Sequence, residues 1–211
     1  MAVVNIREVY PAVSLGLWQV DETVEDMYES YPWASAYKDE LEKNYKSDGR
    51  KLEFLVARAL LREMLKNQGC AEVKIDKIAN IRHNKDGKPL MDGFHVSVSH
   101  TKGFVAVIIS RKQEVAVDIE YFSDRVKKVA SKFLRKDEKA SDLDSLLVHW
   151  CAKETMYKLF SEENLQFQEM RVKPFDTMSD WNCVIENLKS HRTLLVDFEL
   201  TMEFVLTYAA Q

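Results

Sequence analysis

A short strand in the second half of the chain constrains the fold more than any other segment. Residues 115–120 read V-A-V-D-I-E, in which apolar residues alternate with a small residue and two carboxylates. Successive side chains of a strand point to opposite faces, so Asp118 and Glu120 share one face. The other face is apolar. The pattern predicts a strand that packs one face on a core and presents two acids on the other.

A helix downstream carries a matching set of polar residues. Residues 150–158 read W-C-A-K-E-T-M-Y-K, and Trp150, Glu154 and Lys158 recur every four residues, on one side of a helix. Three carboxylates with a lysine suit a Mg²⁺ ion that holds a phosphate-rich substrate. Plainer readings stay open at this point. The strand acids also fit the solvent face of an edge strand, and Glu154 with Lys158 fits a surface ion pair worth about 0.2–0.5 kcal/mol.

Two upstream motifs complete an ordered set of four. Residues 86–89 read D-G-K-P and residues 97–101 read S-V-S-H-T, ahead of A-V-D-I-E at 116–120 and the helix motif at 150–158. In this order the motifs resemble those of the 4′-phosphopantetheinyl transferases, in the larger pseudo-dimeric class typified by the surfactin-synthetase-activating enzyme. Ala116 stands where the family has glycine, and Thr155 where it has alanine or serine. Both are small enough to be tolerated.

The resemblance implies a fold and an activity. The fold would be α+β, with two similarly folded α/β halves forming a pseudo-dimer, residues 1–112 and 113–211, and the active site at their interface. The activity, of the holo-[acyl-carrier-protein] synthase type, would transfer the 4′-phosphopantetheine arm of coenzyme A to a serine of an apo acyl or peptidyl carrier protein. Adenosine 3′,5′-bisphosphate would be released.

The resemblance also implies roles for individual residues. Asp118, Glu120 and Glu154 would hold Mg²⁺, or Mn²⁺. Glu154 would also act as the base for the acceptor hydroxyl, directly or through water, and Lys158 would neutralise charge on the pyrophosphate. Coenzyme A would be contacted by Lys88, Ser99, His100 and Arg58, with His100 at the 3′-phosphate.

Several basic residues have two readings each. Arg58 fits a phosphate contact, or else a surface or salt-bridged position. Lys153 fits a phosphate contact or an exposed position. The D-G-K-P segment that contains Lys88 is also an ordinary turn sequence. Trp150 is more often a core residue than a substrate contact. The candidates for further nucleotide contacts near the N-terminus are Lys38, Lys43 and Lys46.

Composition narrows the setting of the protein. Hydrophobic residues make up 46% and charged residues 30% of the 211 positions, as in globular proteins. The longest apolar run, residues 104–109, is too short to cross a membrane, and the start of the chain lacks a secretory signal. Cys70, Cys151 and Cys183 are widely spaced, which favours a reducing, cytoplasmic setting. The net charge of −4 argues against nucleic-acid binding. We expect a monomer.

Local patterns predict the elements. Helices are expected over residues 21–38 with an interruption near Pro32, and over 50–67, 124–134 and 143–160. Strands are expected over 2–10, 73–81, 95–99, 104–110, 115–121, 181–187, 193–199 and 204–209, with a junction between the halves at 111–114.

The predicted helix after the acidic strand is unusually basic. Residues 125–139 hold seven basic and two acidic residues in an otherwise acidic chain. Such a patch would steer an acidic carrier protein, although a solvated helix face explains it equally well.

Two other function classes deserve comparison with the transferase. One is a non-catalytic protein of the same fold that binds coenzyme A or a carrier, but all the motif carboxylates and the helix lysine are present. The other is an unrelated Mg²⁺-dependent nucleotide enzyme. It would need its own phosphate loop, and the chain contains no G-x-x-x-x-G-K-[ST].

Overall fold

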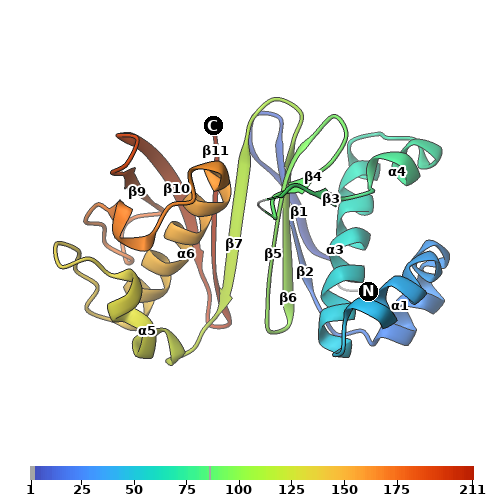
Figure 1. Ribbon diagram of the computed structural model, residues 1–211, viewed down its shortest axis with the longest axis horizontal. Helices are drawn as coiled ribbons and strands as arrows, with labels where there is room; N and C mark the ends of the chain where they lie inside the picture. The colour runs from blue at the N-terminus through green and yellow to red at the C-terminus, as the bar shows by residue number, and fades with distance from the viewer. Residues whose placement is uncertain (1–2, 86) are drawn as a thin grey trace.

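Two antiparallel sheets pack face to face between outer layers of helices. The computed structural model describes residues 3–85 and 87–211, and Figure 1 shows the four layers. The first sheet has the order β1 (Val3–Tyr10), β2 (Val13–Gln19), β6 (Phe104–Ser110), β5 (His95–Thr101). The second has the order β7 (Val115–Tyr121), β11 (Phe204–Ala210), β10 (Arg192–Leu200), β9 (Asn182–Asn187), β8 (Met170–Val172). The predicted mixed α+β fold is confirmed.

The helices of the first half cover the outer face of the first sheet. They are α1 (Val24–Ser30), the 3₁₀ turn η1 (Pro32–Tyr37), α2 (Lys38–Asn44), α3 (Asp48–Asn67) and α4 (Glu72–Ile78). The N-cap of α3 is Ser47, whose hydroxyl accepts from the amide of Arg50. The long helix lies close to β2 at Gly16, where a Cβ atom would lie 2.8 Å from the sulfur of Met64. Glycine therefore permits this contact between helix and sheet.

The helices of the second half cover the outer face of the second sheet. They are α5 (Arg125–Phe133), α6 (Leu143–Leu159) and the 3₁₀ turns η2 (Ser161–Glu163) and η3 (Phe167–Glu169). Helix α6 begins after Asp142, whose carboxylate accepts from the amide of Ser145 at 2.8 Å. Its residues Leu147, Cys151 and Thr155 are buried at helical spacing against the sheet.

Each sheet shares a hydrophobic core with its own helices, and a third core fills the space between the two sheets. Alternate residues of β2 and β6 meet alternate residues of β7 and β11 there, and the rings of Phe104 and Phe204 lie 4.8 Å apart. Polar contacts between Arg7 and Glu199 and between Tyr10 and Asp197 also join β1 to β10. The two sheets therefore share a buried core. The division into related domains at 1–112 and 113–211, and the pseudo-dimer, stay predictions.

Most predicted elements are present, and the main error concerns residues 73–81. This segment forms helix α4 followed by a short connection. Ile75 and Ala79 are buried four residues apart, whereas Val73 is exposed, so the apolar spacing is helical. Strands β2 and β8 and helix α2 were not predicted. A small hairpin of β3 (Arg82–His83) and β4 (Pro89–Leu90) follows α4. Residues 1–2 and Asp86 lie outside the described residues. They include the first residue of the strand predicted over 2–10 and the first residue of D-G-K-P.

Candidate active site

The site is built around the line where β5 of the first sheet meets β7 of the second. Three hydroxyl groups of β5 accept hydrogen bonds from amides of β7. The pairs are Val117 to Ser97 at 3.2 Å, Ile119 to Ser99 at 3.3 Å and Tyr121 to Thr101 at 3.0 Å. The S-V-S-H-T motif thus supplies partners for the free edge of β7, which would otherwise hold unsatisfied amides.

The acids of β7 point away from the central core and toward α6, as predicted. Asp118 is only 5% exposed. Its Oδ1 accepts from the Ser99 hydroxyl at 2.9 Å and from the Lys158 ammonium at 2.8 Å. Glu120 accepts from Trp150 Nε1 at 3.3 Å and from the Thr101 hydroxyl at 3.4 Å. β7 is an edge strand, but the reading of its acids as solvent-facing is wrong for Asp118, which is buried, whereas Glu120 is partly exposed.

Helix α6 brings Glu154 to the same place. The pKa of Glu154 is raised to about 7, first by burial and then by the carboxylates of Asp118 and Glu120, against the lowering effect of Lys158. The pKa of Glu120 is raised by burial and by Asp118. Lys158 pairs with Asp118, so the alternative of a surface pair between Glu154 and Lys158 is not what the structure shows.

The buried thiol on the same helix has no place as a nucleophile. Cys151 is fully buried, and its pKa is raised well above the usual value by burial and by the nearby charges of Asp118 and Glu120. A thiol held in its protonated form is a weak nucleophile. Cys151 therefore offers no thiolate at the acids.

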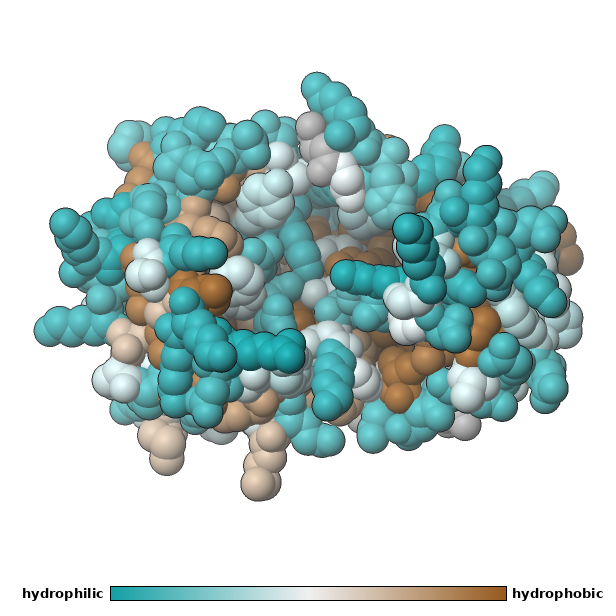
Figure 2. Space-filling model, turned by 60° about the horizontal axis from the view of Figure 1, so that its bottom comes forward, coloured by the Kyte–Doolittle hydropathy of each residue, from teal (hydrophilic) through white to brown (hydrophobic). Residues whose placement is uncertain are grey.

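A cavity of about 260 Å³ lies beside this site, between α3 and the hairpin of β3 and β4. Arg50, Arg58, His83 and His100 line it together with aromatic and apolar groups. The hollow in the middle of the face in Figure 2 has hydrophilic side chains around its rim and hydrophobic ones at depth. The guanidinium groups of Arg50 and Arg58 with an aromatic wall suit a phosphorylated nucleotide, and this space is called the basic cavity below.

His100 joins the cavity to the acids. Its Nε2 lies 3.3 Å from Nη1 of Arg50, and its Nδ1 lies 3.3 Å from Oε2 of Glu53. Burial lowers the pKa of His100, and the charges of Lys158 and Asp118 also act on it. The imidazole therefore lies within electrostatic reach of both the nucleotide-sized cavity and the carboxylates.

Arg58 is buried, so the surface reading for it is wrong. The side chain is 8% exposed, its guanidinium lies 3.2 Å from the centroid of the Phe54 ring, and burial lowers its pKa. Arg50 was missed by the sequence analysis. The signal was present, because Arg50, Phe54 and Arg58 recur every four residues on α3. Lys38, Lys43 and Lys46 do not line this cavity.

Lys88 borders a cavity, whereas Ser99 is buried against β7. Lys88 pairs with Glu114 at 2.8 Å and lines a second cavity of about 130 Å³, which Lys158 and Tyr157 also border. Gly87, Pro89 and Val98 line both cavities, so the two are adjacent. Ser99 is 7% exposed and bonds to Asp118 and to the β7 backbone. The nucleotide contacts of Lys88 and Ser99 stay predictions.

Two further cavities flank the acids on the side of α5 and η3. One of about 270 Å³ is bordered by Glu120, Arg125, Val126 and Trp150. The other, also about 270 Å³, is bordered by Glu154, Tyr157, Gln166 and Phe167. Tyr157 was not singled out from the sequence. Glu154 therefore borders a cavity that is distinct from the basic cavity.

The carboxylates provide a donor set that fits a divalent cation. The Oδ2 atom of Asp118 is buried without a hydrogen-bond partner in the described part of the chain. Asp118 and Glu120 also raise the pKa of Glu154, an excess of negative charge that a cation would relieve. Within residues 3–85 and 87–211, however, no three His, Cys, Asp or Glu side chains are gathered closely enough to enclose a metal ion. The metal role of the three acids stays a prediction.

Comparison with known families identifies the second half of the chain. Residues 114–209 match the 4′-phosphopantetheinyl transferase superfamily. The matched segment covers less than half of the chain and contains Asp118, Glu120, Glu154 and Lys158. Lys88, His100 and Arg58 lie outside it. Compared with curated proteins, the chain has no match.

The match points to phosphopantetheine transfer, with coenzyme A as the substrate of the superfamily and a divalent metal as its usual companion. The surfactin-synthetase-activating subclass is not established by it. In the described residues, no helix is both long and apolar enough to cross a membrane.

Proposed function

We propose that the protein is a cytoplasmic, monomeric holo-[acyl-carrier-protein] synthase type enzyme, which transfers 4′-phosphopantetheine from coenzyme A to a serine of an apo acyl or peptidyl carrier protein. One observation carries the proposal. The segment that matches the superfamily contains Asp118, Glu120, Glu154 and Lys158, whose charges act on one another beside the cavity lined by Arg50 and Arg58. Acids and cations so arranged suit pyrophosphate chemistry.

The residues divide the work of binding. His100, Arg50 and Arg58 would hold the 3′-phosphoadenosine in the basic cavity, with Lys88 at its edge. Asp118, Glu120 and Glu154 would hold Mg²⁺, or Mn²⁺, which supplies charge neutralisation on the pyrophosphate.

The reaction forms one bond and breaks one. The carrier serine oxygen attacks the β-phosphorus of coenzyme A, and the bond from that phosphorus to the bridging oxygen breaks. Adenosine 3′,5′-bisphosphate leaves. Glu154 would take the serine proton directly or through water, and Lys158 would offset the charge that builds on the leaving phosphate. The nucleophile belongs to the carrier.

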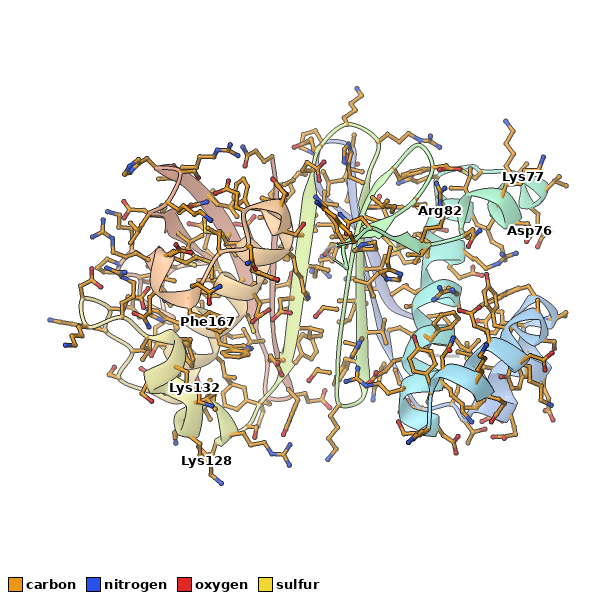
Figure 3. All side chains as sticks on the ribbon, viewed as in Figure 1. Asp76, Lys77, Arg82, Lys128, Lys132 and Phe167 are labelled. Atoms are coloured by element: carbon orange, nitrogen blue, oxygen red, sulfur yellow. The ribbon has the colours of Figure 1, made fainter. Side chains whose placement is uncertain are left out.

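The basic helix α5 is the proposed docking surface for the carrier. Lys128 and Lys132 are exposed on α5 at the edge of the molecule, near the acids in sequence (Figure 3). An acidic helical carrier would be steered toward these charges.

A mass measurement tests the proposal. The protein is incubated with Mg²⁺, coenzyme A and an apo carrier, and the carrier is weighed by mass spectrometry. A gain equal to one phosphopantetheine supports the proposal. A protein that binds coenzyme A and never modifies any carrier would instead be the non-catalytic binding protein of the same fold.

A further inference from the structure

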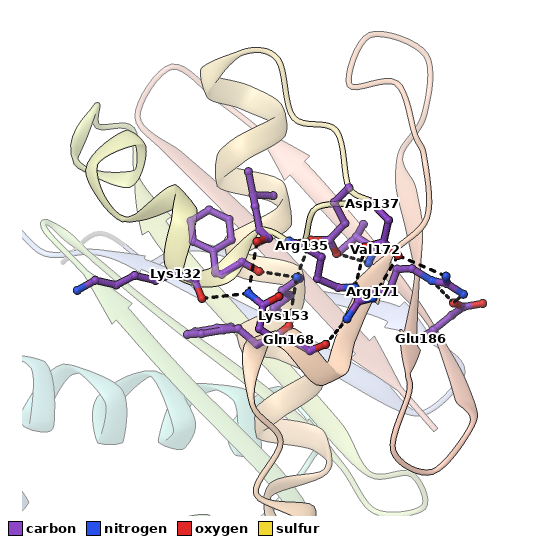
Figure 4. A network of polar contacts seen from close by, with 12 residues as sticks. Lys132, Arg135, Asp137, Lys153, Gln168, Arg171, Val172 and Glu186 are labelled. Carbon is purple, nitrogen blue, oxygen red and sulfur yellow. Dashed lines mark hydrogen bonds and ion pairs between the residues drawn. The ribbon is translucent and has the colours of Figure 1, made fainter.

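A fully buried ion pair lies outside the candidate active site. Lys153 Nζ and Glu138 Oε2 are 2.7 Å apart, and both side chains are 0% exposed. Figure 4 shows Lys153 at the centre of a polar network. The two readings of Lys153 from the sequence, a phosphate contact or an exposed residue, are both wrong. A buried lysine of this kind is tolerated only with complete pairing.

The pairing of the Lys153 ammonium is complete. Its three donors are matched by Glu138, by the carbonyl of Phe133 at 2.7 Å and by the carbonyl of Phe167 at 3.3 Å. Phe133 ends α5, and Phe167 begins η3. One side chain of α6 therefore holds the backbone of two neighbouring elements.

Glu138 extends the network in two more directions. Its Oε1 accepts from the amide of Val172 in β8 at 2.7 Å, and its Oε2 accepts from the amide of Arg135 at 2.8 Å. Arg135 in turn donates to the carbonyl of Gln168, and the Gln168 side chain donates to the carbonyl of Leu134 at 3.3 Å. The turn after α5, η3 and β8 are thereby fastened to each other around the ion pair (Figure 4).

The rings of the two residues held by Lys153 flank Trp150. The Trp150 ring lies 5.2 Å from that of Phe133 and 5.2 Å from that of Phe167. Trp150 also donates to Glu120 and borders one of the cavities at the acids, and Phe167 borders the other. Lys153 thus fixes the backbone of Phe167, which borders one cavity, and of Phe133, whose ring packs on the Trp150 wall of the other.

We infer that Lys153 is a positioning residue, which sets the end of α5 and η3 against Trp150 and so shapes the carrier side of the site. The inference rests on the proposed function for its consequence in transfer. Replacing a buried pair by apolar residues is often nearly neutral for stability. The role of the pair here is positional, because its hydrogen bonds fix where two backbone segments lie.

Hydrogen exchange read by mass spectrometry tests the positioning without any substrate. Lys153→Met should raise exchange at residues 133–138 and 166–172 by about tenfold, with residues 95–110 unchanged. Lys51→Met is the matched control, because Lys51 is also a buried, carboxylate-paired lysine, on α3. It should leave residues 133–138 and 166–172 unchanged.

A double variant keeps the test decisive if Lys153→Met does not fold. Lys153→Met with Glu138→Leu removes both charges, so no buried charge is left unpaired. It should keep near wild-type unfolding midpoints and still show the local rise in exchange. Unchanged exchange in the double variant, or a rise spread evenly over the chain, would overturn the inference.

Kinetics then link positioning to transfer. In the double variant the KM for the carrier should rise about tenfold or more, whereas the Kd for coenzyme A should stay within about twofold, because no member of the pair lines the basic cavity. The single variant Lys153→Arg keeps a cationic donor, so its KM for the carrier should lie between the values of the wild type and the double variant. Equal losses for carrier and coenzyme A would overturn the inference. A wild-type protein that modifies no carrier would refute only the proposed function, since exchange is measured without substrate.

Discussion

Burial and neighbouring charges strongly shift the ionisation of Glu154. Its pKa of about 7 lies above the ordinary 4.5 because of burial and the charges of Asp118 and Glu120. The native state therefore binds the proton more tightly than the unfolded chain does. Protonation of Glu154 therefore stabilises the native state. This stabilisation is complete below pH 4.5 and is lost as the pH rises to 7.

A pH series on the metal-free protein measures this effect. Between pH 4.5 and 7 the wild type should lose up to ~3 kcal/mol of unfolding free energy relative to Glu154→Gln. Urea denaturation at both pH values gives the difference. Glu162→Gln, at an exposed position, is the control and should follow the wild type. Parallel curves for wild type and Glu154→Gln would show that Glu154 ionises normally.

Removing Asp118 should remove the response to a divalent cation. Mg²⁺ at about 100 times its Kd should stabilise the wild type by about 2.7 kcal/mol. Asp118→Asn should abolish this gain and most of the transfer. Thermal unfolding with and without Mg²⁺ is the measurement, and Asp39→Asn, at an exposed position, is the control. Full transfer in excess chelator would contradict the metal role.

His100 should discriminate coenzyme A from its 3′-dephospho form. His100→Ala should weaken the binding of coenzyme A by about 1.5–3 kcal/mol, the range for hydrogen bonds to charged groups. It should weaken the binding of 3′-dephospho-coenzyme A much less. Calorimetric titration of both ligands gives the comparison. An equal loss for both would place His100 away from the 3′-phosphate.

Elements with a strong local period were predicted well, and those without one were not. The alternation in residues 115–120 and the four-residue spacing of Trp150, Glu154 and Lys158 both place side chains on the faces where the structure has them. The role of Lys153 could not be predicted, because its partners Glu138 and Phe167 are brought to it by two irregular turns. Sequence spacing does not encode such contacts.

Charge reversals on helix α5 should weaken the interaction with the carrier and not the binding of coenzyme A. Reversing Lys128 and Lys132 to glutamate should raise the KM for an acidic carrier several-fold and leave that for coenzyme A nearly unchanged. The control reverses Lys74 and Lys77 on α4, at the other end of the molecule (Figure 3).

The dependence of the carrier KM on salt concentration is a second test of the α5 surface. The wild-type carrier KM should rise with ionic strength, because charges farther apart than about 8 Å are largely screened at 0.15 M salt. If both double reversals leave the carrier KM untouched, α5 is a solvated face and the carrier docks elsewhere.

At the scale of the whole molecule, the contact between the two sheets was the least predictable feature. The four motifs anticipated which acids and hydroxyls share a site, but not that Ser97 and Thr101 would pair with the edge of β7. Nor did the apolar run at 104–109 reveal that β6 packs on helix α3 with one face and on the second sheet with the other. Both contacts depend on how distant elements assemble, which local pattern cannot specify.

The shared core between the sheets should make the halves unfold together. Leu206 on β11 is 0% exposed within this core, and Leu195 on β10 of the same sheet is 52% exposed. Leu206→Ala should lower the unfolding free energy by about 2–5 kcal/mol, the range for a buried leucine. Leu195→Ala should change it by less than about 0.5 kcal/mol.

Two probes decide whether the loss is shared by both halves. Hydrogen exchange at α3, in the first half, and at α6, in the second, should rise by the same factor in Leu206→Ala, because loss of the common core destabilises both sheets. Urea unfolding should stay a single transition. If exchange rises only in α6 and unfolding splits into two steps, the halves are independently stable. The site between β5 and β7 would then depend on their docking alone.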